Sequence, residues 1–226
     1  MRLADIPGKF DPMAELNQDN TPVVWFGGTF DPVHNGHLVI ARCAAEQVKA
    51  GKVVLAPARC NPLKNSPAAS PGDRVKMLKI AVEGDPLFEI DRAEINRRGP
   101  SYTVDTIEHT MRKRKNKKMY LLAGADSLNE LTSWHRVEDL LQMVTLLVAC
   151  RPPADIEQVN KNIAQIGNIL RGKTGDRLNI SAITAPMLEI SSTDIRRRVN
   201  ASRSIKYLVP ETVEDYIEKR ALYRDK

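Results

Sequence analysis

Cysteine is scarce in this sequence. The chain of 226 residues has three cysteines, Cys43, Cys60 and Cys150, which lie far apart and form no CxxC pair. Disulfide-stabilised extracellular domains have more cysteines at short spacings, and cysteine zinc sites use closely spaced pairs. The sequence therefore indicates neither a disulfide framework nor a cysteine zinc site, and we expect a protein of the reducing cytoplasm.

Long apolar runs are also absent. The most apolar stretch, Met143 to Cys150, is far shorter than the ~20 residues that a helix needs to cross a bilayer. Residues 1–20 contain no apolar segment of the kind found in secretory signals, and they carry four acidic side chains. We therefore expect no membrane partner. We predict a polar, mobile extension over residues 1–20 and a single folded domain over residues 21–226.

Neither sign of charge dominates strongly. The 34 basic and 28 acidic residues give a formal net charge of +6, and the sequence pI is about 9.3. Hydrophobic residues make up 42% and charged residues 27%, which is ordinary for a soluble protein and excludes a collagen-like or wholly disordered chain. The basic balance favours an anionic partner, which could be nucleic acid, a membrane surface or a phosphorylated small molecule.

Short apolar segments alternate with segments of helical periodicity from Thr21 onward. Several apolar segments are continuous, which is typical of strands in a parallel sheet covered by helices on both faces. The pattern predicts an α/β fold with a doubly wound, mainly parallel, Rossmann-like sheet and a small helical C-terminal subregion. Strands are expected over 23–26, 53–56, 87–90, 119–123, 144–149 and 178–183, and helices over 37–50, 71–82, 101–115, 137–141, 154–170, 192–200 and 210–221.

The segment from Gly27 to Leu38, GGTFDPVHNGHL, joins the first expected strand to the first expected helix. In doubly wound sheets ligands bind beyond the carboxyl ends of the strands. Glycines let the backbone approach a phosphate closely, and a helix N-terminus attracts anions. His34 and His37 are three residues apart, so they can face the same side and donate hydrogen bonds to phosphate. The segment therefore predicts a phosphate-binding turn.

Two other interpretations of this turn remain open. Gly27 and Gly28 could form a simple turn with both histidines on the surface. Alternatively, His34 and His37 could bind zinc, although zinc would need further ligands, and no glutamate lies between the histidines as in a zincin motif.

The segment from Gly167 to Thr174, GNILRGKT, matches the P-loop pattern GxxxxGK[ST]. A P-loop follows a strand and opens a helix. Here the preceding residues have helical spacing, and a strand pattern follows Asp176, so the order of the elements is reversed. We therefore interpret the segment as a helix end, with Gly172 as its C-cap.

The segment from Ile190 to Arg198, ISSTDIRRR, opens a helix with adjacent hydroxyl groups and places Arg196 about one turn inside. Hydroxyls, N-terminal amides and a guanidinium group can together donate to phosphate oxygens. Taken alone, the segment is better explained as an ordinary serine N-cap on an exposed basic helix, because caps of this type are common.

A basic run, Arg112 to Lys118, could contact nucleic acid. However, it closes an expected helix, where positive charge is favourable, and it lacks interleaved aromatic residues for base stacking. We interpret it as a solvated helix end and expect no nucleic-acid partner. A basic nucleic-acid-binding protein remains the alternative from a different class.

The segments Gly27–Leu38 and Ile190–Arg196 together resemble the two signatures, HxGH and ISSTxxR, of a nucleotidyltransferase superfamily. Within it, the chain is similar to the bacterial nicotinate-nucleotide adenylyltransferases. The stretches GPSYTVDT at Gly99–Thr106 and GADSL at Gly124–Leu128, together with Trp134, support that branch. The resemblance implies transfer of AMP from ATP to nicotinate mononucleotide, which yields deamido-NAD and pyrophosphate by direct in-line attack. An enzyme that prefers nicotinamide mononucleotide is the nearest alternative.

The resemblance also implies roles for individual residues. Mg²⁺ would accompany ATP, held mostly by phosphates and water, and no protein metal site is expected. The catalytic residues would be His34, His37, Lys64 and Arg196. The ATP site would comprise Gly27, Gly28, Thr29, Phe30, Gly36, Gly124, Asp126, Ile190, Ser191, Ser192 and Thr193, and the nicotinate mononucleotide site Tyr102, Thr103, Trp134 and His135.

Overall fold

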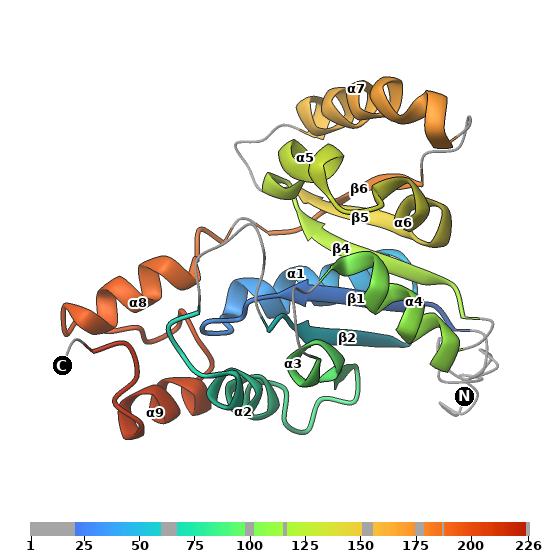
Figure 1. Cartoon of the computed structure of the whole chain (residues 1–226). Coiled ribbons are helices and arrows are strands. Elements are labelled where there is room, and N and C mark those ends of the chain that lie inside the picture. The colour runs from blue at the N-terminus through green and yellow to red at the C-terminus, as the bar shows by residue number, and fades with distance from the viewer. Residues whose placement is uncertain are drawn as a thin grey trace, which may run out of the picture.

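A single sheet of parallel strands organises the computed structural model (Figure 1). The structure describes residues 21–59, 67–97, 102–114, 117–150, 156–174, 179–186 and 188–224, so the predicted extension 1–20 lies outside it. The strand order is β3-β2-β1-β4-β5-β6. The strands are β1 (Val23–Gly28), β2 (Lys52–Pro57), β3 (Phe88–Ile90), β4 (Met119–Gly124), β5 (Thr145–Cys150) and β6 (Ile180–Thr184). This confirms the predicted doubly wound α/β fold.

Every strand except the edge strand β3 contributes to a hydrophobic core on both faces of the sheet. In β1, Val24 and Phe26 pack into one core while Val23 and Trp25 pack into the other. This division follows from the two-residue side-chain period of a strand. Both faces must therefore be apolar, which explains why the strands read as continuous apolar runs.

The helices cover the two faces in separate groups (Figure 1). One face is covered by α1 (Asn35–Gln47), α2 (Pro71–Ala81), α8 (Ser192–Asn200) and α9 (Glu211–Lys219). The other is covered by α4 (Thr103–Lys113), α5 (Asp126–Glu130), α6 (Val137–Met143) and α7 (Ile156–Thr174), with a 3₁₀ turn η1 at Leu131–Ser133. A short helix, α3 (Ala93–Asn96), follows β3.

The strand order reverses beside β1. From β1 the chain proceeds outward to β2 and β3, then returns to place β4 on the other side of β1. Such a reversal leaves a crevice beyond the carboxyl ends of the two central strands, where doubly wound proteins bind ligands. Gly28 and Gly124 end these two strands, so the phosphate-binding turn predicted from the sequence begins at this crevice.

The segment that matches the P-loop pattern is helical throughout. Residues Gly167–Thr174 form the last turns of α7, and no strand leads into them. This confirms that the match is not a P-loop. The expected C-cap at Gly172 is wrong because the helix continues through it to Thr174, and a single glycine costs a helix only about 1 kcal/mol. Among the helices that the structure describes, none has the length and apolarity to cross a membrane.

The predicted C-terminal subregion consists of α8 and α9, and α9 packs on α2. Asp73 of α2 is the polar centre of this contact: it accepts hydrogen bonds from the hydroxyls of Ser70 at 2.6 Å and Tyr216 at 2.9 Å. Arg220 Nε lies 3.7 Å from the same carboxylate. The Ser70 hydrogen bond is the main reason that the pKa of Asp73 lies below its usual value.

Replacing Asp73 with alanine should lower the free energy of unfolding by about 1 kcal/mol at pH 7, the usual scale for a helix-start hydrogen bond. Because the pKa is lower in the folded state, the contribution of Asp73 is full above about pH 4 and is lost as pH falls through the folded pKa. Urea unfolding of the wild type and the variant at pH 7 and pH 3 checks this. Asp215→Ala, an exposed position on α9, is the control, and an equal Asp73→Ala effect at both pH values would contradict the prediction.

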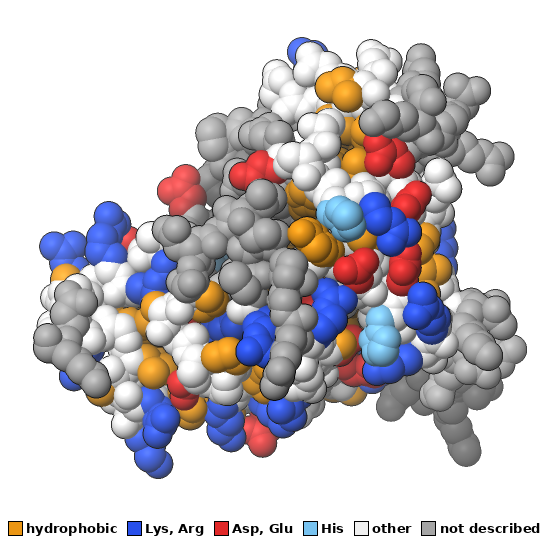
Figure 2. Space-filling view, in the orientation of Figure 1, with side chains coloured by type: hydrophobic (Ala, Val, Ile, Leu, Met, Phe, Trp, Pro, Cys, Tyr) orange, Lys and Arg blue, Asp and Glu red, His pale blue; other side chains and the backbone are white. Residues whose placement is uncertain are grey.

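Charge on the visible face is distributed rather than concentrated. Figure 2 shows Lys and Arg side chains along the edge formed by α8, α9 and α2, whereas both signs are interspersed around α4. In the basic run, Arg112 lies 3.7 Å from Glu108, Arg114 pairs with Glu89, and Lys118 lies over the Tyr120 ring. These local partners favour the interpretation of the run as a helix end.

Candidate active site

His34 and His37 form the start of α1. His34 is the N-cap, its Nδ1 accepts from the backbone N–H of His37 at 3.3 Å, and His37 Nδ1 accepts from the N–H of His34 at the same distance. The two rings stack with centroids 3.6 Å apart. This reciprocal arrangement is a capping box made from two histidines in place of the usual hydroxyl and carboxylate pair. It starts the helix at Asn35, two residues before the expected start.

The capping box occupies the same nitrogen of both rings. Nδ1 of each imidazole accepts a backbone hydrogen bond, so the nitrogen that could donate to a ligand is Nε2. Side-chain burial differs between them: His34 is buried, with 3% exposed, and His37 is partly exposed. Of the two, His37 has the greater access to a ligand from solvent.

Close packing leaves little room for a Cβ atom at the glycines of this turn. A Cβ atom at Gly27 would lie 2.5 Å from the Trp25 ring, and one at Gly36 would lie 3.1 Å from the His34 ring. A Cβ atom at Gly36 would also lie 3.6 Å from Ile190 Cβ, so the start of α1 and the segment before α8 are in contact. By contrast, a Cβ at Gly124 would meet no described atom within 4 Å, so the end of β4 is open.

Phe30 packs between the turn and the hydrophobic core. Its backbone is in the left-handed region, with φ of 49°, and its side chain is buried. The Phe30 ring packs edge-on against His37 at 5.0 Å and against Phe26 at 5.5 Å. The Phe30 side chain thus belongs to the hydrophobic core and holds the His37 ring in place.

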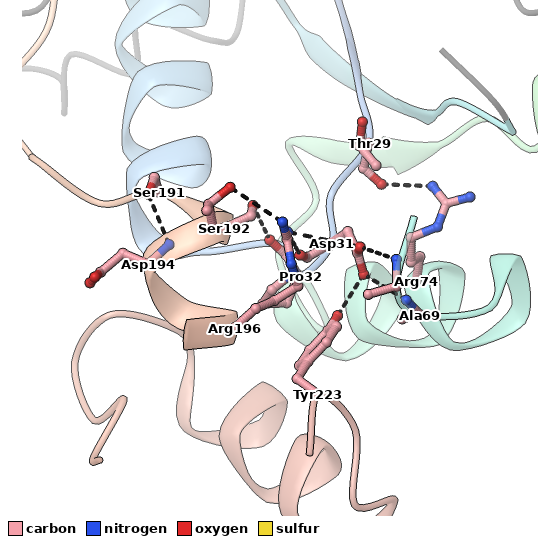
Figure 3. Close-up of polar contacts among 12 residues, drawn as sticks. Thr29, Asp31, Pro32, Ala69, Arg74, Ser191, Ser192, Asp194, Arg196 and Tyr223 are labelled. Carbon is pink, nitrogen blue, oxygen red and sulfur yellow. Dashed lines mark hydrogen bonds and ion pairs between the residues drawn. The ribbon is translucent and has the colours of Figure 1, made fainter. Parts of the chain in front are cut away.

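The N-terminus of α8 is attached directly to this turn (Figure 3). Ser191 caps α8 by accepting from the N–H of Asp194, and the Ser192 hydroxyl donates to the Pro32 carbonyl at 2.9 Å. Arg196 donates to the Asp31 carbonyl at 2.7 Å and to the Thr193 hydroxyl at 3.2 Å. The fold therefore brings together the two motifs, about 160 residues apart in the chain, and the Ser192 hydroxyl links them.

Two charged residues that the sequence analysis did not select as site residues are buried at this turn. Asp31 is buried, and its carboxylate accepts from the N–H groups of Ala68 at 2.7 Å and Ala69 at 3.1 Å and from the Tyr223 hydroxyl at 2.8 Å. Arg74 is fully buried and donates to the carbonyls of Thr29 at 2.7 Å and Ala58 at 2.8 Å. Burial lowers the pKa of Arg74, while the nearby Asp31 acts in the opposite direction.

The residues expected at the nicotinate ring form a second group. The rings of Tyr102 and His135 lie 4.4 Å apart, and Tyr102 and Trp134 pack at the edge of the second hydrophobic core. Thr103 is the first residue of α4, and Tyr102 is its N-cap residue. A crossover helix runs antiparallel to its strands, so the start of α4 lies toward the carboxyl edge of the sheet, the same edge as the histidines.

The side chains of two predicted site residues are not described. Lys64 lies outside the described residues. Asp126 is the first residue of α5, directly after β4, but its side chain is not described. Among the described residues, no three His, Cys, Asp or Glu side chains form a group that could hold a metal ion.

Together, the doubly wound sheet and the pairing of two motifs at its crevice define a nucleotidyltransferase. The family model described as cytidylyltransferase-like matches residues 25–198, which is most of the chain. The chain thus belongs to the cytidylyltransferase-like class of nucleotidyltransferases.

Its relatives define the branch. The chain is 39% identical over 200 residues to a probable nicotinate-nucleotide adenylyltransferase of Moorella thermoacetica, covering 88% of this chain and 89% of the relative. It is 35% identical over 200 residues to a protein of the same name from Thermomicrobium roseum, covering 88% and 90%. Within the class, the chain belongs to the nicotinate-nucleotide adenylyltransferase family.

Solved structures agree on the fold. The Plasmodium falciparum nicotinic acid mononucleotide adenylyltransferase complexed with NaAD superimposes with a TM-score of 0.70 at 19% identity. The alignment covers 90% of this chain and 98% of that chain. The sheet and its helices are therefore shared with a protein whose sequence is largely different.

Proposed function

We propose that this protein transfers the adenylyl group of ATP to nicotinate mononucleotide, using the crevice between β1 and β4. In this reaction an oxygen of the mononucleotide phosphate forms a bond to the α-phosphorus of ATP. The bond from that phosphorus to the bridging oxygen breaks, and pyrophosphate leaves. The products are deamido-NAD and pyrophosphate.

The convergence of two helix N-termini at the end of β1 carries this proposal. The Ser192–Pro32 hydrogen bond joins the start of α8 to the turn that leads into α1, and each helix start presents backbone N–H groups and a partial positive charge. Two such ends at one crevice favour a ligand with several negative charges. A nucleoside triphosphate and its departing pyrophosphate fit that requirement.

The side chains described in this crevice supply hydrogen-bond donors but include no activated nucleophile. His37 and His34 would donate Nε2–H to ATP phosphates near the transferred group. Arg196 uses two of its nitrogens within the protein and retains further N–H donors for the triphosphate. Lys64 and Ser191 are proposed to add to these contacts. Catalysis would then consist of positioning the reactants and stabilising the charge on the departing pyrophosphate.

The remaining predicted residues would bind the other parts of the substrates. Gly27, Gly28 and Gly124 would let ATP approach the ends of β1 and β4, and Asp126 would hold the adenosine ribose. Trp134 would stack on the pyridine ring beside Tyr102, Thr103 and His135. Mg²⁺ is proposed to enter with ATP, and we assign its ligands to phosphates and water.

An assay with two substrates tests the choice of mononucleotide. We expect pyrophosphate release from ATP and Mg²⁺ to be at least tenfold faster, in kcat/KM, with nicotinate mononucleotide than with nicotinamide mononucleotide. The physical reason is that a carboxylate needs only donors, whereas an amide also needs an acceptor, so a site with donors alone leaves the amide N–H₂ unpaired. Equal or better use of the amide would overturn the assignment of the substrate.

A further inference from the structure

Tyr223 connects the C-terminal segment to the buried Asp31 (Figure 3). Its hydroxyl donates to Asp31 Oδ1 at 2.8 Å across 192 residues of sequence. The Tyr223 backbone has a φ of 63°, in the left-handed region that aromatic residues rarely adopt. A conformation of this kind persists only where the surrounding structure holds it, so the contact with Asp31 is a candidate for function.

Asp31 distributes its contacts among the elements of the site. Oδ1 accepts from Tyr223 and from the N–H of Ala69, and Oδ2 accepts from the N–H of Ala68. The main-chain carbonyl of Asp31 accepts from Arg196, and the same guanidinium nitrogen lies 3.9 Å from Oδ2. Arg196 can therefore bind Asp31 in two ways, through the carbonyl as observed or through the carboxylate.

The Tyr223 hydroxyl influences which of these two ways is favoured. When Oδ1 has two donors, the negative charge of the carboxylate is well satisfied, and Arg196 stays on the carbonyl. Without the Tyr223 hydroxyl, the carboxylate keeps only the two backbone donors, and its attraction for the guanidinium grows because a buried carboxylate requires compensation. The side chain of Arg196 would then turn toward Oδ2.

We infer that Tyr223 is a positioning residue for adenylyl transfer, which acts through Asp31 to hold Arg196 where it can bind the phosphates of ATP. This inference rests on the proposed function, since it concerns the same crevice. The hydroxyl is suited to the role because burial, and then the charge of Asp31, raise the pKa of Tyr223 far above its ordinary value. It therefore remains a donor throughout the pH range in which the enzyme could work.

The test uses Tyr223→Phe with a matched control in the same subregion. Tyr216 donates to Asp73 at 2.9 Å, so Tyr216→Phe removes a second tyrosine–aspartate hydrogen bond of nearly equal length, one that involves neither Asp31 nor Arg196. The measurement is the dissociation constant of ATP by titration calorimetry on the full chain, together with KM for both substrates. We expect Tyr223→Phe to weaken ATP binding about tenfold, with KM for the mononucleotide changed less than twofold. We expect Tyr216→Phe to leave ATP binding unchanged although it lowers the melting temperature to a similar extent.

A double-mutant cycle separates positioning from simple stabilisation. If Tyr223 acts through Arg196, then Tyr223→Phe introduced into the Arg196→Ala variant should change ATP affinity less than twofold. A tenfold loss that persists in the Arg196→Ala background, or equal losses from both tyrosine variants, would overturn the inference. Because ATP binding is measured directly, a wild type that binds ATP but does not use nicotinate mononucleotide would contradict the proposed function and leave this test intact.

Discussion

Replacing His37 with alanine should lower kcat about 10²–10³-fold, the scale expected when one charge-stabilising donor is removed from a preorganised site. His37 is the more exposed of the two stacked histidines, and its Nδ1 is engaged in the capping box, so Nε2 is the nitrogen that would donate to phosphate. The loss should fall mainly on kcat because the charge on pyrophosphate develops as the reaction proceeds. Steady-state pyrophosphate release with saturating substrates measures it.

Lys173→Ala is the control for the choice of phosphate site. Lys173 stands in the segment that matches the P-loop pattern but forms part of α7. Its replacement should change turnover less than twofold. If Lys173→Ala lost more activity than His37→Ala, the phosphate site would have been assigned to the wrong segment. Thermal unfolding of His37→Ala should accompany the assay, because His37 is also the N3 residue of the α1 capping box.

Replacing Arg74 with methionine should destabilise the folded protein by about 3 kcal/mol or more. Methionine can fill most of the volume, but the partly buried carbonyls of Thr29 and Ala58 would lose donors 2.7 and 2.8 Å away. An unsatisfied buried carbonyl costs about 1–3 kcal/mol. For a domain of this size, the melting temperature should fall by roughly 6–12 °C. Calorimetry or circular dichroism on heating measures the change.

The same helix offers the matched comparison. Lys76, two residues from Arg74 in α2, is exposed, and Lys76→Met should alter the melting temperature by no more than about 2 °C. Because Arg74 holds the carbonyl of Thr29 at the start of the phosphate-binding turn, Arg74→Met should also lower activity at temperatures where it remains folded. A variant as stable as the wild type would show that the buried guanidinium is dispensable.

The sheet could be predicted from the sequence because the residue types in its strands indicate whether one face or both faces are buried. Continuous apolar strands require two covered faces, and Val24 and Trp25 indeed pack on opposite sides of β1. Short elements could not be predicted in this way. Helices α3 and α5 and the turn η1 contain three to five residues each, too few to show a helical period. The start of α1 was missed because a histidine is an unusual N-cap.

The motifs of the site could also be predicted, but their supporting residues could not. Sequence spacing indicated a phosphate-binding turn and a helix start, and only the fold brings Ser192 onto Pro32. Asp31 and Arg74 were missed because charged side chains are normally exposed, and no local pattern shows that these two are buried. The contact of Tyr223 with Asp31 depends entirely on the path of the C-terminal segment.

That path determines when the site can form. The histidines are synthesised early, but the hydrogen bonds that fix their turn come from Ser192, Arg196 and Tyr223, 160 to 192 residues later. Contacts of such long range slow folding because the intervening chain must be ordered first. A growing chain can therefore pair β1 with β2 well before the Gly27–Leu38 turn has its final shape. The contacts that complete this turn come from α8 and from Tyr223, which follow the last strand of the sheet in the sequence.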